Sequence, residues 1–275
     1  MPEQKKYPEP VEALLLILAV FAFFIVLTLL ISLLSGAGLQ SPGSVSESSR
    51  YIVLFGSSLF LIIPLYYAHI KKYPVKKVFR FKAVSWRVVV LSLVIGISVG
   101  VLSDELDRII NLFFPVPAWI TEITRPLIVK SDLDWLWIIA GAVLITGFAE
   151  EALFRGFLQT SLENKGNVNR AVVLSSLTWT LIHSNPYWAI SIFITGIIFG
   201  YLSWRSESIL PSFIAHGSNN FLAILFINLD ASEMQHVQSW YEMGAHVSPA
   251  VLLISAFLLV WAIRKMSALY QNPQN

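Results

Sequence analysis

Residues 135–160 read WLWIIAGAVLITGFAEEALFRGFLQT, an apolar stretch long enough to cross a membrane that nevertheless holds three charged side chains. These side chains are Glu150, Glu151 and Arg155. Burying a charge in hydrocarbon is costly, so membrane proteins keep such groups mainly where they serve a function. His183 and His216 lie in two further apolar segments of the same half of the chain. The pattern predicts one polar site assembled between membrane-spanning helices.

The composition excludes an ordinary soluble domain. Of the 275 residues, 56% are hydrophobic and only 13% are charged, whereas a soluble domain carries about 25% charged residues. The chain contains no cysteine, which rules out disulfides, thiolate metal sites and cysteine nucleophiles. The first apolar run, residues 11–34, is too long for the core of a cleavable signal peptide and suits a membrane span.

Hydropathy predicts an all-α, polytopic membrane protein with about eight transmembrane helices in a single membrane domain, residues 1–275. The expected spans are 11–34, 51–69, 88–103, 135–160, 170–184, 187–204, 208–228 and 248–263. Segment 104–134 mixes acidic and apolar residues, so we expect it to extend the third span and then lie at the extracytoplasmic interface. The catalytic core is expected over about 135–228.

The distribution of basic residues predicts the orientation in the membrane. The loop between the second and third spans carries seven basic residues and no acid: Lys71, Lys72, Lys76, Lys77, Arg80, Lys82 and Arg87. Basic loops stay in the cytoplasm, and eight spans then place both termini and the loops at 161–170 and 204–207 there as well. The loops at 104–134 and 229–247, which are rich in acids, are expected outside.

The two adjacent glutamates differ in their spacing from Arg155 and therefore in the helix face they occupy. Glu151 and Arg155 are four residues apart, on one helix face, so they can neutralise each other as an ion pair. A buried salt bridge that fixes helix packing is therefore an alternative to a direct catalytic role for these two. Glu150 is rotated by about 100° from Glu151 and lacks that partner. A carboxylate without an ion-pair partner at membrane depth is typical of a functional site.

The histidines lie at different places on their spans. His183 is close to the end of the fifth span, just before Asn185-Pro186, where proline stops the helix. A histidine at a span end is often interfacial, but this span ends early and leaves His183 within the bilayer. His216 and Asn220 share one face of the seventh span, and a polar contact between helices is the alternative reading of this pair.

The depth of these groups permits a single site. At about 1.5 Å per residue, Glu150 lies roughly 22 Å from Lys165, and His183 lies roughly 20 Å from Arg170. By the same measure, His216 and Asn220 lie roughly 12 and 18 Å from Ser208, and all three reference residues are at the predicted cytoplasmic side. These depths overlap near the middle of the membrane, so we expect a polar cavity between the fourth, fifth and seventh spans.

This set of side chains suits hydrolysis of a peptide bond by an activated water molecule. A carboxylate beside a histidine can hold and deprotonate water, and a second histidine with an asparagine can donate hydrogen bonds to the developing oxyanion. Zinc held by Glu150, His183 and His216 is the competing mechanism, although the chain has no His-Glu-x-x-His sequence. Serine chemistry is disfavoured because the chain has no Gly-x-Ser-x-Gly sequence.

At these residues the chain resembles the CPBP family, which contains CAAX prenyl proteases of the Rce1 type and bacteriocin-processing or immunity (Abi) proteins. Its three motifs are Glu-Glu-x-x-x-Arg, Phe-x-x-x-His and His-x-x-x-Asn. They match in order at Glu150–Arg155, at Trp179–His183 and at His216–Asn220, with Trp179 in place of the phenylalanine. The resemblance covers about residues 145–225.

The resemblance implies a role for each residue. Glu150 and His183 would activate the water, and His216 and Asn220 would form the oxyanion hole. Glu151 and Arg155 would support them, and the change to Trp179 would affect local packing or substrate binding.

The resemblance also implies the partners and the setting. The substrate would be a membrane-associated or lipidated peptide or protein, either a prenylated CAAX sequence or a leader peptide. Lipid bilayer is the other expected partner, nucleic acid is not expected, and no cofactor is expected unless zinc is bound. The implied location is a prokaryotic cell membrane. Two other functions stay open: a non-enzymatic immunity or partner-binding protein, and a transporter with a proton relay.

Overall fold

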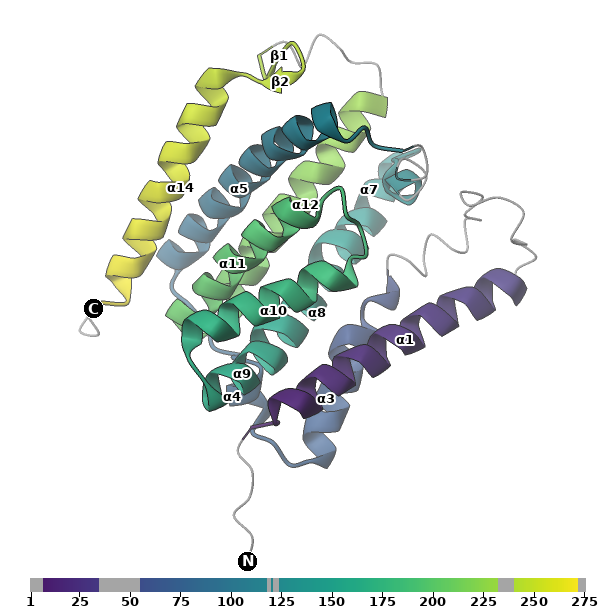
Figure 1. Ribbon diagram of the computed structural model, residues 1–275, viewed down its shortest axis with the longest axis vertical. Helices are drawn as coiled ribbons and strands as arrows, with labels where there is room; N and C mark the ends of the chain where they lie inside the picture. Colours follow the sequence, from purple (N-terminus) through teal and green to yellow (C-terminus); the bar gives the residue numbers. More distant parts are fainter. Residues whose placement is uncertain (1–6, 35–54, 118–119, 121–123, 232–239, 272–275) are drawn as a thin grey trace, which may run out of the picture.

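The protein is described by a computed structural model over residues 7–34, 55–117, 120, 124–231 and 240–271. Its helices and strands, labelled as in Figure 1, are α1 (Pro10–Leu34), α3 (Leu59–Ile70), α4 (Val75–Val78), α5 (Trp86–Phe113), the 3₁₀ turn η1 (Arg125–Leu127), α7 (Asp132–Ile138), the π-helical segment η2 (Ile139–Ile145), α8 (Thr146–Glu151), the π-helical segment η3 (Ala152–Leu158), α9 (Gln159–Lys165), α10 (Val168–Ile182), α11 (Ala189–Ser206), α12 (Leu210–Ala231), β1 (Glu242–Met243), β2 (His246–Val247) and α14 (Pro249–Leu269).

The predicted all-α membrane architecture is confirmed. In the described part of the chain, six helical runs are long and apolar enough to cross a membrane, and two shorter apolar helices, α3 and α10, accompany them. These eight helical segments follow the order of the predicted spans. Residues 51–54 of the second predicted span lie outside the described residues. Helix α5 continues through the acidic residues to Phe113, so the start of segment 104–134 extends the third span as expected.

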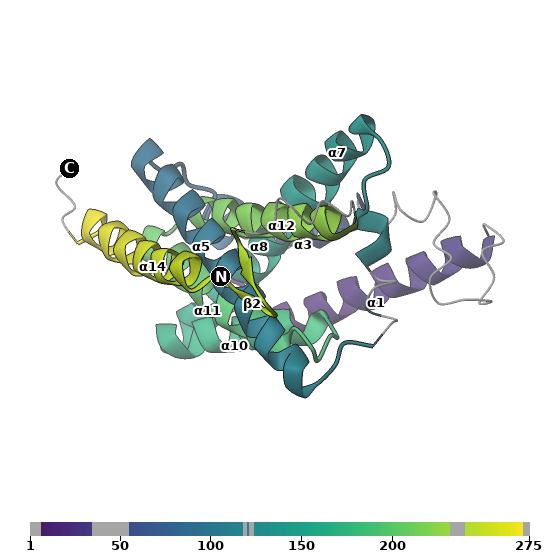
Figure 2. The ribbon, with the colours of Figure 1, turned by 90° about the horizontal axis from the view of Figure 1, so that it is seen from above.

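Helix α5 lies between α14 and α12, and α11 lies between α10 and α12 (Figure 1). The α8 segment contacts both α12 and α3. Seen from above, α1 extends from the bundle on the side opposite α14 (Figure 2). Large apolar side chains on these two outer helices face outward: Leu15 is 61% exposed and Leu253 is 73% exposed. A bilayer would cover them, because lipid replaces water around such surfaces.

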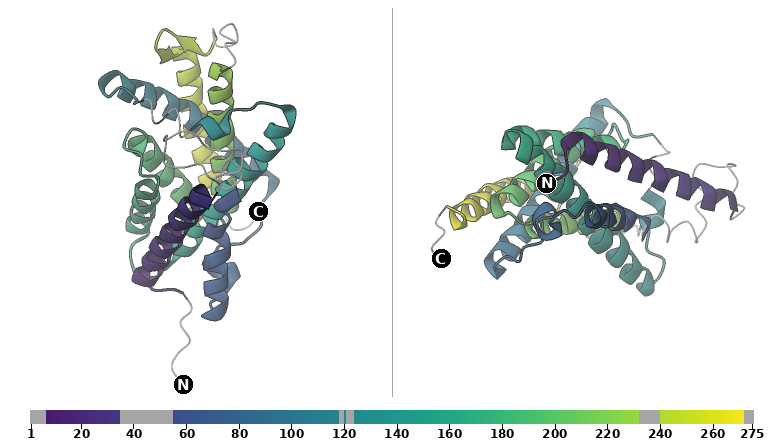
Figure 3. Two further views of the ribbon diagram at one scale, coloured as in Figure 1. Left: turned by 90° about the vertical axis from the view of Figure 1, so that its right-hand side faces the viewer. Right: turned by 90° about the horizontal axis from the view of Figure 1, so that it is seen from below.

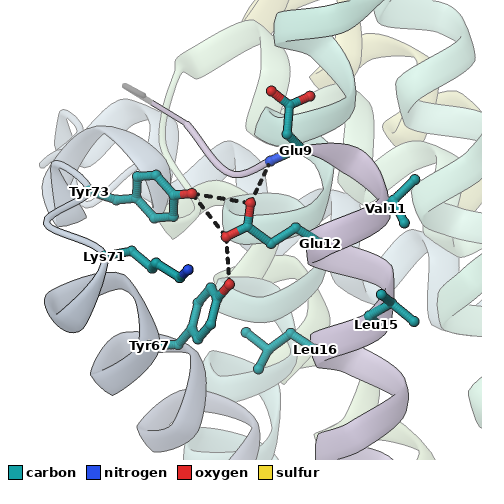
Figure 4. A pocket seen from close by; sticks show the side chains of 8 residues that line it. All are labelled: Glu9, Val11, Glu12, Leu15, Leu16, Tyr67, Lys71 and Tyr73. Carbon is teal, nitrogen blue, oxygen red and sulfur yellow. Dashed lines mark hydrogen bonds between the residues drawn. The ribbon is translucent and has the colours of Figure 1, made fainter. Parts of the chain in front are cut away.

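Helices α1 and α3 lie side by side at the edge of the bundle (Figures 1 and 3), and a cluster of polar side chains joins them. The Glu12 carboxylate accepts hydrogen bonds from the hydroxyls of Tyr67 and Tyr73, at 2.5 and 2.9 Å, and from the backbone N–H of Glu9 at 3.2 Å (Figure 4). Burial and the hydrogen bond to Glu12 raise the pKa of Tyr73, so this hydroxyl stays protonated and donates at neutral pH. The cluster thus fixes where α1 begins against α3.

The loops that were predicted to be cytoplasmic gather at one end of the bundle. Lys82 pairs with Glu207 at 3.5 Å, and Arg80 forms an ion pair with Glu163. The Arg205 guanidinium donates to the carbonyl oxygen of Ser267, near the end of α14, at 2.9 Å. Such clustering is what a single cytoplasmic face requires. Which face of the membrane this end occupies stays a prediction.

Small residues let α5 and α12 approach closely. A methyl group on Gly96 would clash with the carbonyl oxygen of Ala215 on α12. Helix pairs in membranes use glycine in this way because they lack a strong hydrophobic driving force between helices and depend on close packing. By contrast, a methyl group on Gly147 would meet the Phe213 ring at 3.6 Å and the backbone nitrogen of Gly217 at 3.8 Å, both ordinary van der Waals distances.

We therefore predict that Gly96→Ala destabilises the protein by about 1–3 kcal/mol through overpacking. Gly147→Ala is the matched control, because both substitutions gain the same intrinsic helix propensity and only the methyl group on Gly96 would clash with backbone atoms. The measurement is thermal unfolding of both purified variants in detergent. Equal midpoints for the two variants would contradict the close approach of α5 and α12.

Candidate active site

The two adjacent glutamates end a short α-helical segment that lies between two π-helical segments. Glu150 and Glu151 close α8, and Arg155 lies in η3, inside one continuous helical run, Asp132–Lys165. Single π-helical turns occur often at functional sites, because they shift side chains relative to a regular helix. Sequence reasoning expected a regular helix here and missed η2 and η3. No residue pattern in this stretch signals them.

Glu151 and Arg155 form the predicted ion pair. Arg155 Nη1 donates to Glu151 Oε1 at 2.9 Å, and both side chains are fully buried. Arg155 Nη2 also donates to the carbonyl oxygen of Gly196 on α11 at 3.3 Å. His216 Nδ1 lies 3.0 Å from the same Glu151 oxygen. One buried carboxylate therefore ties together the α8–η3 run, α11 through Arg155, and α12.

Glu150 has different neighbours from Glu151, as its rotation about the helix predicted. Its Oε2 accepts a hydrogen bond from the indole Nε1 of Trp179 at 2.7 Å. His216 Nε2 lies 4.0 Å from the same oxygen, too far for a direct hydrogen bond. Within the described residues, no lysine or arginine forms an ion pair with Glu150. The carboxylate is 9% exposed and keeps lone pairs for a further donor.

Trp179 is the centre around which the other side chains are arranged. Its ring makes edge contacts with His183 and His216, with centroids 4.9 and 5.3 Å apart. The Arg155 guanidinium lies over its face at 4.4 Å, in the geometry of a cation–π interaction. Sequence reasoning assigned Trp179 only to substrate binding or local packing and missed its bond to Glu150. The available signal was the indole N–H, which needs a partner when buried.

His183 lies at the edge of this cluster. It caps the C-terminal end of α10, its Nδ1 is 2.8 Å from the carbonyl oxygen of Trp179, and its side chain is exposed. No hydrogen bond or ion pair joins it to Glu150 among the described residues. The structure thus connects His183 to the expected base through Trp179 and not by direct contact.

His216 and Asn220 sit on one face of α12, as their spacing predicted, but meet different partners. The ring of His216 stacks on Phe199, with centroids 5.4 Å apart, and bonds Glu151. Asn220 Nδ2 donates to the carbonyl oxygen of Ala142 in η2 at 3.1 Å. This hydrogen bond ties α12 to η2. One amide hydrogen of Asn220 remains for another acceptor.

The competing zinc mechanism requires Glu150, His183 and His216 to converge. Within the part of the chain that is described, no group of three or more His, Cys, Asp or Glu side chains is placed to hold a metal ion. Trp179 lies against both histidine rings instead. The donor set as arranged does not fit a three-ligand zinc site, so we derive no step through a metal.

Comparison with known families finds one match in this region. Residues 132–222 match the family model described as type II CAAX prenyl endopeptidase Rce1-like. The match runs from the start of α7 into α12 and contains all the site residues named above. No curated protein and no solved structure matched the chain. Over residues 132–222 this chain therefore carries a domain of the Rce1-like type II CAAX prenyl endopeptidase family, which implies a peptidase within a multi-pass membrane protein.

Proposed function

We propose that the protein is an intramembrane endopeptidase that uses Glu150 to activate water for attack on a peptide bond of a membrane-associated substrate. The observation that carries the proposal is the state of Glu150. It is a buried carboxylate that no lysine or arginine pairs with in the described residues, held by one N–H of Trp179 and 4.0 Å from His216 Nε2. The family match over the same residues supports a peptide or protein as the substrate.

The proposed chemistry needs no covalent enzyme intermediate. Glu150 takes a proton from water, the water oxygen attacks the carbonyl carbon, and the carbonyl π electrons move onto oxygen. Collapse of the tetrahedral intermediate breaks the C–N bond, and the proton on Glu150 passes to the leaving amine. His183, whose ring packs on the tryptophan that holds Glu150, assists the water in this scheme.

His216 and Asn220 are the proposed donors to the oxyanion. A ring that donates from Nδ1 to Glu151 presents Nε2 as an acceptor when neutral and as a donor when protonated. The oxyanion role needs the protonated form, with its charge balanced by Glu151. The remaining amide hydrogen of Asn220 would be the second donor. Removing one such donor typically costs about 3–4 kcal/mol of transition-state stabilisation.

The test uses full-length protein in proteoliposomes with two sets of membrane-anchored peptides. One set ends in a prenylated CAAX sequence and the other contains unlipidated leader peptides. We expect mass spectrometry to detect cleavage within one set, at a rate that a metal chelator does not change. Binding of both sets without cleavage would favour a non-enzymatic partner-binding protein. Activity that is lost on chelation and restored by zinc would favour the zinc mechanism.

Trp179 offers a sharper test of how Glu150 is positioned. Trp179→Phe keeps an aromatic ring for Arg155 and the histidines but removes the N–H bonded to Glu150. A hydrogen bond to a charged group is worth about 1.5–3 kcal/mol, so we expect kcat to fall roughly 10- to 100-fold with little change in KM. Trp204→Phe, the same change on α11 away from the site, is the control. A fall in both variants alike would contradict the positioning role.

A further inference from the structure

A cavity of about 380 Å³ adjoins the proposed active site, with α5, α11 and α12 forming most of its walls. Trp179, whose indole N–H bonds Glu150, forms part of its lining. The volume falls in the usual range for ligand pockets, roughly 300–1,000 Å³. A smaller hollow of about 160 Å³ shares Asp104, Asp107 and Trp188 with it. The two hollows therefore adjoin at these residues, and Trp179 lines the larger one.

The lining of this cavity contains both apolar and polar side chains. Leu222, Phe226 and Ile227 of α12 supply apolar surface, whereas Asn219 and Ser103 supply polar groups. An extended peptide with an apolar side chain would be covered by the α12 residues. The polar side chains of the lining would then select the peptide side chain next to the apolar one.

The two carboxylates in the lining differ in their partners. Asp104 is neutralised: Arg108 Nε lies 3.0 Å from its Oδ2, and the Tyr241 hydroxyl donates to it at 2.8 Å. Asp107 is half-buried and accepts a hydrogen bond from the Ser191 hydroxyl. No lysine, arginine or histidine pairs with Asp107 among the residues that the structure describes. Partial burial of a carboxylate costs free energy, and a cationic ligand beside it would offset part of that cost.

We propose that Asp107 is a specificity-determining residue, and that the substrate of this site is a peptide with a basic side chain next to an apolar one. The inference rests on the proposed function and adds the class of substrate to it. The basic side chain pairs with Asp107 where the two hollows meet, and the apolar side chain lies against Leu222 and Phe226. The peptide backbone then continues toward Trp179 and Glu150.

Binding is measured separately from cleavage, with full-length protein in nanodiscs that carries Glu150→Gln so that no peptide is consumed. The probes are fluorescently labelled apolar peptides, identical except that one position at a time is Lys, Gln or Glu, and anisotropy gives Kd. At one position we expect Lys to bind about tenfold more tightly than Gln, the effect of about 1.4 kcal/mol. Asp107→Asn should remove this preference, and Asp107→Lys should reverse it in favour of Glu.

Three further variants test whether the preference for Lys depends on the negative charge at position 107. Asp107→Glu and Ser191→Ala retain the charge and should keep the preference for Lys. Asp132→Asn removes an exposed carboxylate outside the cavity and should also keep it. A preference that survives Asp107→Asn, or the absence of any preference at every position, would overturn the proposal.

Cleavage of the same peptides by the unmodified chain distinguishes the two proposals. Cleavage without a charge preference leaves the endopeptidase and removes the role of Asp107. Charge-selective binding by a chain that cleaves none of the bound peptides removes the endopeptidase and leaves the binding site.

Discussion

Glu150→Gln is expected to abolish peptide cleavage while the protein still inserts and folds. In the unmodified protein the Trp179 indole N–H donates to Glu150 over 2.7 Å. A glutamine side-chain oxygen still accepts this hydrogen bond, but the neutral amide cannot take a proton from water. General-base catalysis contributes about 10²–10⁴-fold to rates, and we expect a loss of at least that order. Glu150→Ala should be equally inactive. The measurement is the initial rate of product formation by mass spectrometry against a substrate that the unmodified protein cleaves.

The matched control for this prediction is Glu207→Gln, because the Glu207 side chain is 78% exposed and its ion-pair partner is Lys82 at 3.5 Å. It makes the same chemical change far from the site and should keep full activity. Full activity of Glu150→Gln against the same substrate would end the assignment of Glu150 as the base. An equal loss in both variants would point to a general effect on the protein.

Glu151→Ala is expected to act on stability more than on the chemical step. Its carboxylate is the partner of Arg155 at 2.9 Å and of His216 at 3.0 Å, and all three side chains are buried. Removing one partner of a buried pair leaves an uncompensated charge, which costs about 3–5 kcal/mol. We expect a corresponding fall in the free energy of unfolding, measured by thermal or denaturant unfolding of the purified protein in detergent.

A double variant separates loss of the charge from loss of packing. Glu151→Gln with Arg155→Met removes both charges at similar volume, and such replacements are often close to neutral. We expect it to recover much of the stability that Glu151→Ala loses, with an interaction energy visible in a double-mutant cycle. The surface pair Lys82–Glu207 is the control, since breaking an exposed pair costs at most about 1 kcal/mol. A cost for Glu151→Ala as small as that would contradict a structural role for the ion pair.

Local spacing predicted the contacts that lie within one helix. A separation of four residues put Glu151 and Arg155 on one face, and the structure pairs them. The same rule separated Glu150 from that pair. Spacing carried no information on the partner of Glu150, because Trp179 lies 29 residues further along the chain. That contact depends on how α10 is rotated and packed against the helical run that holds α8 and η3.

His183 is a second case in which the sequence did not specify the contacts of a side chain. Hydropathy placed it at the depth of the site, but depth along a helix does not specify the direction in which a side chain points. The structure places its ring against Trp179 and its Nδ1 at the carbonyl oxygen of the same residue. Its predicted part in activating water therefore stays a prediction, and His183→Ala should be assayed beside Glu150→Gln.

The amino-acid sequence by itself determined the class of the protein, the order of its apolar helices and the identity of the ionisable groups that a bilayer would bury. These properties follow from hydropathy and from the cost of burying charge, which act locally along the chain. Only the tertiary structure decided that an indole N–H holds Glu150, that the π-helical segments η2 and η3 flank it, and that Asp107 lines an adjoining cavity with no basic partner among the described residues. Those features depend on which helix faces meet, and close packing between distant segments sets that choice.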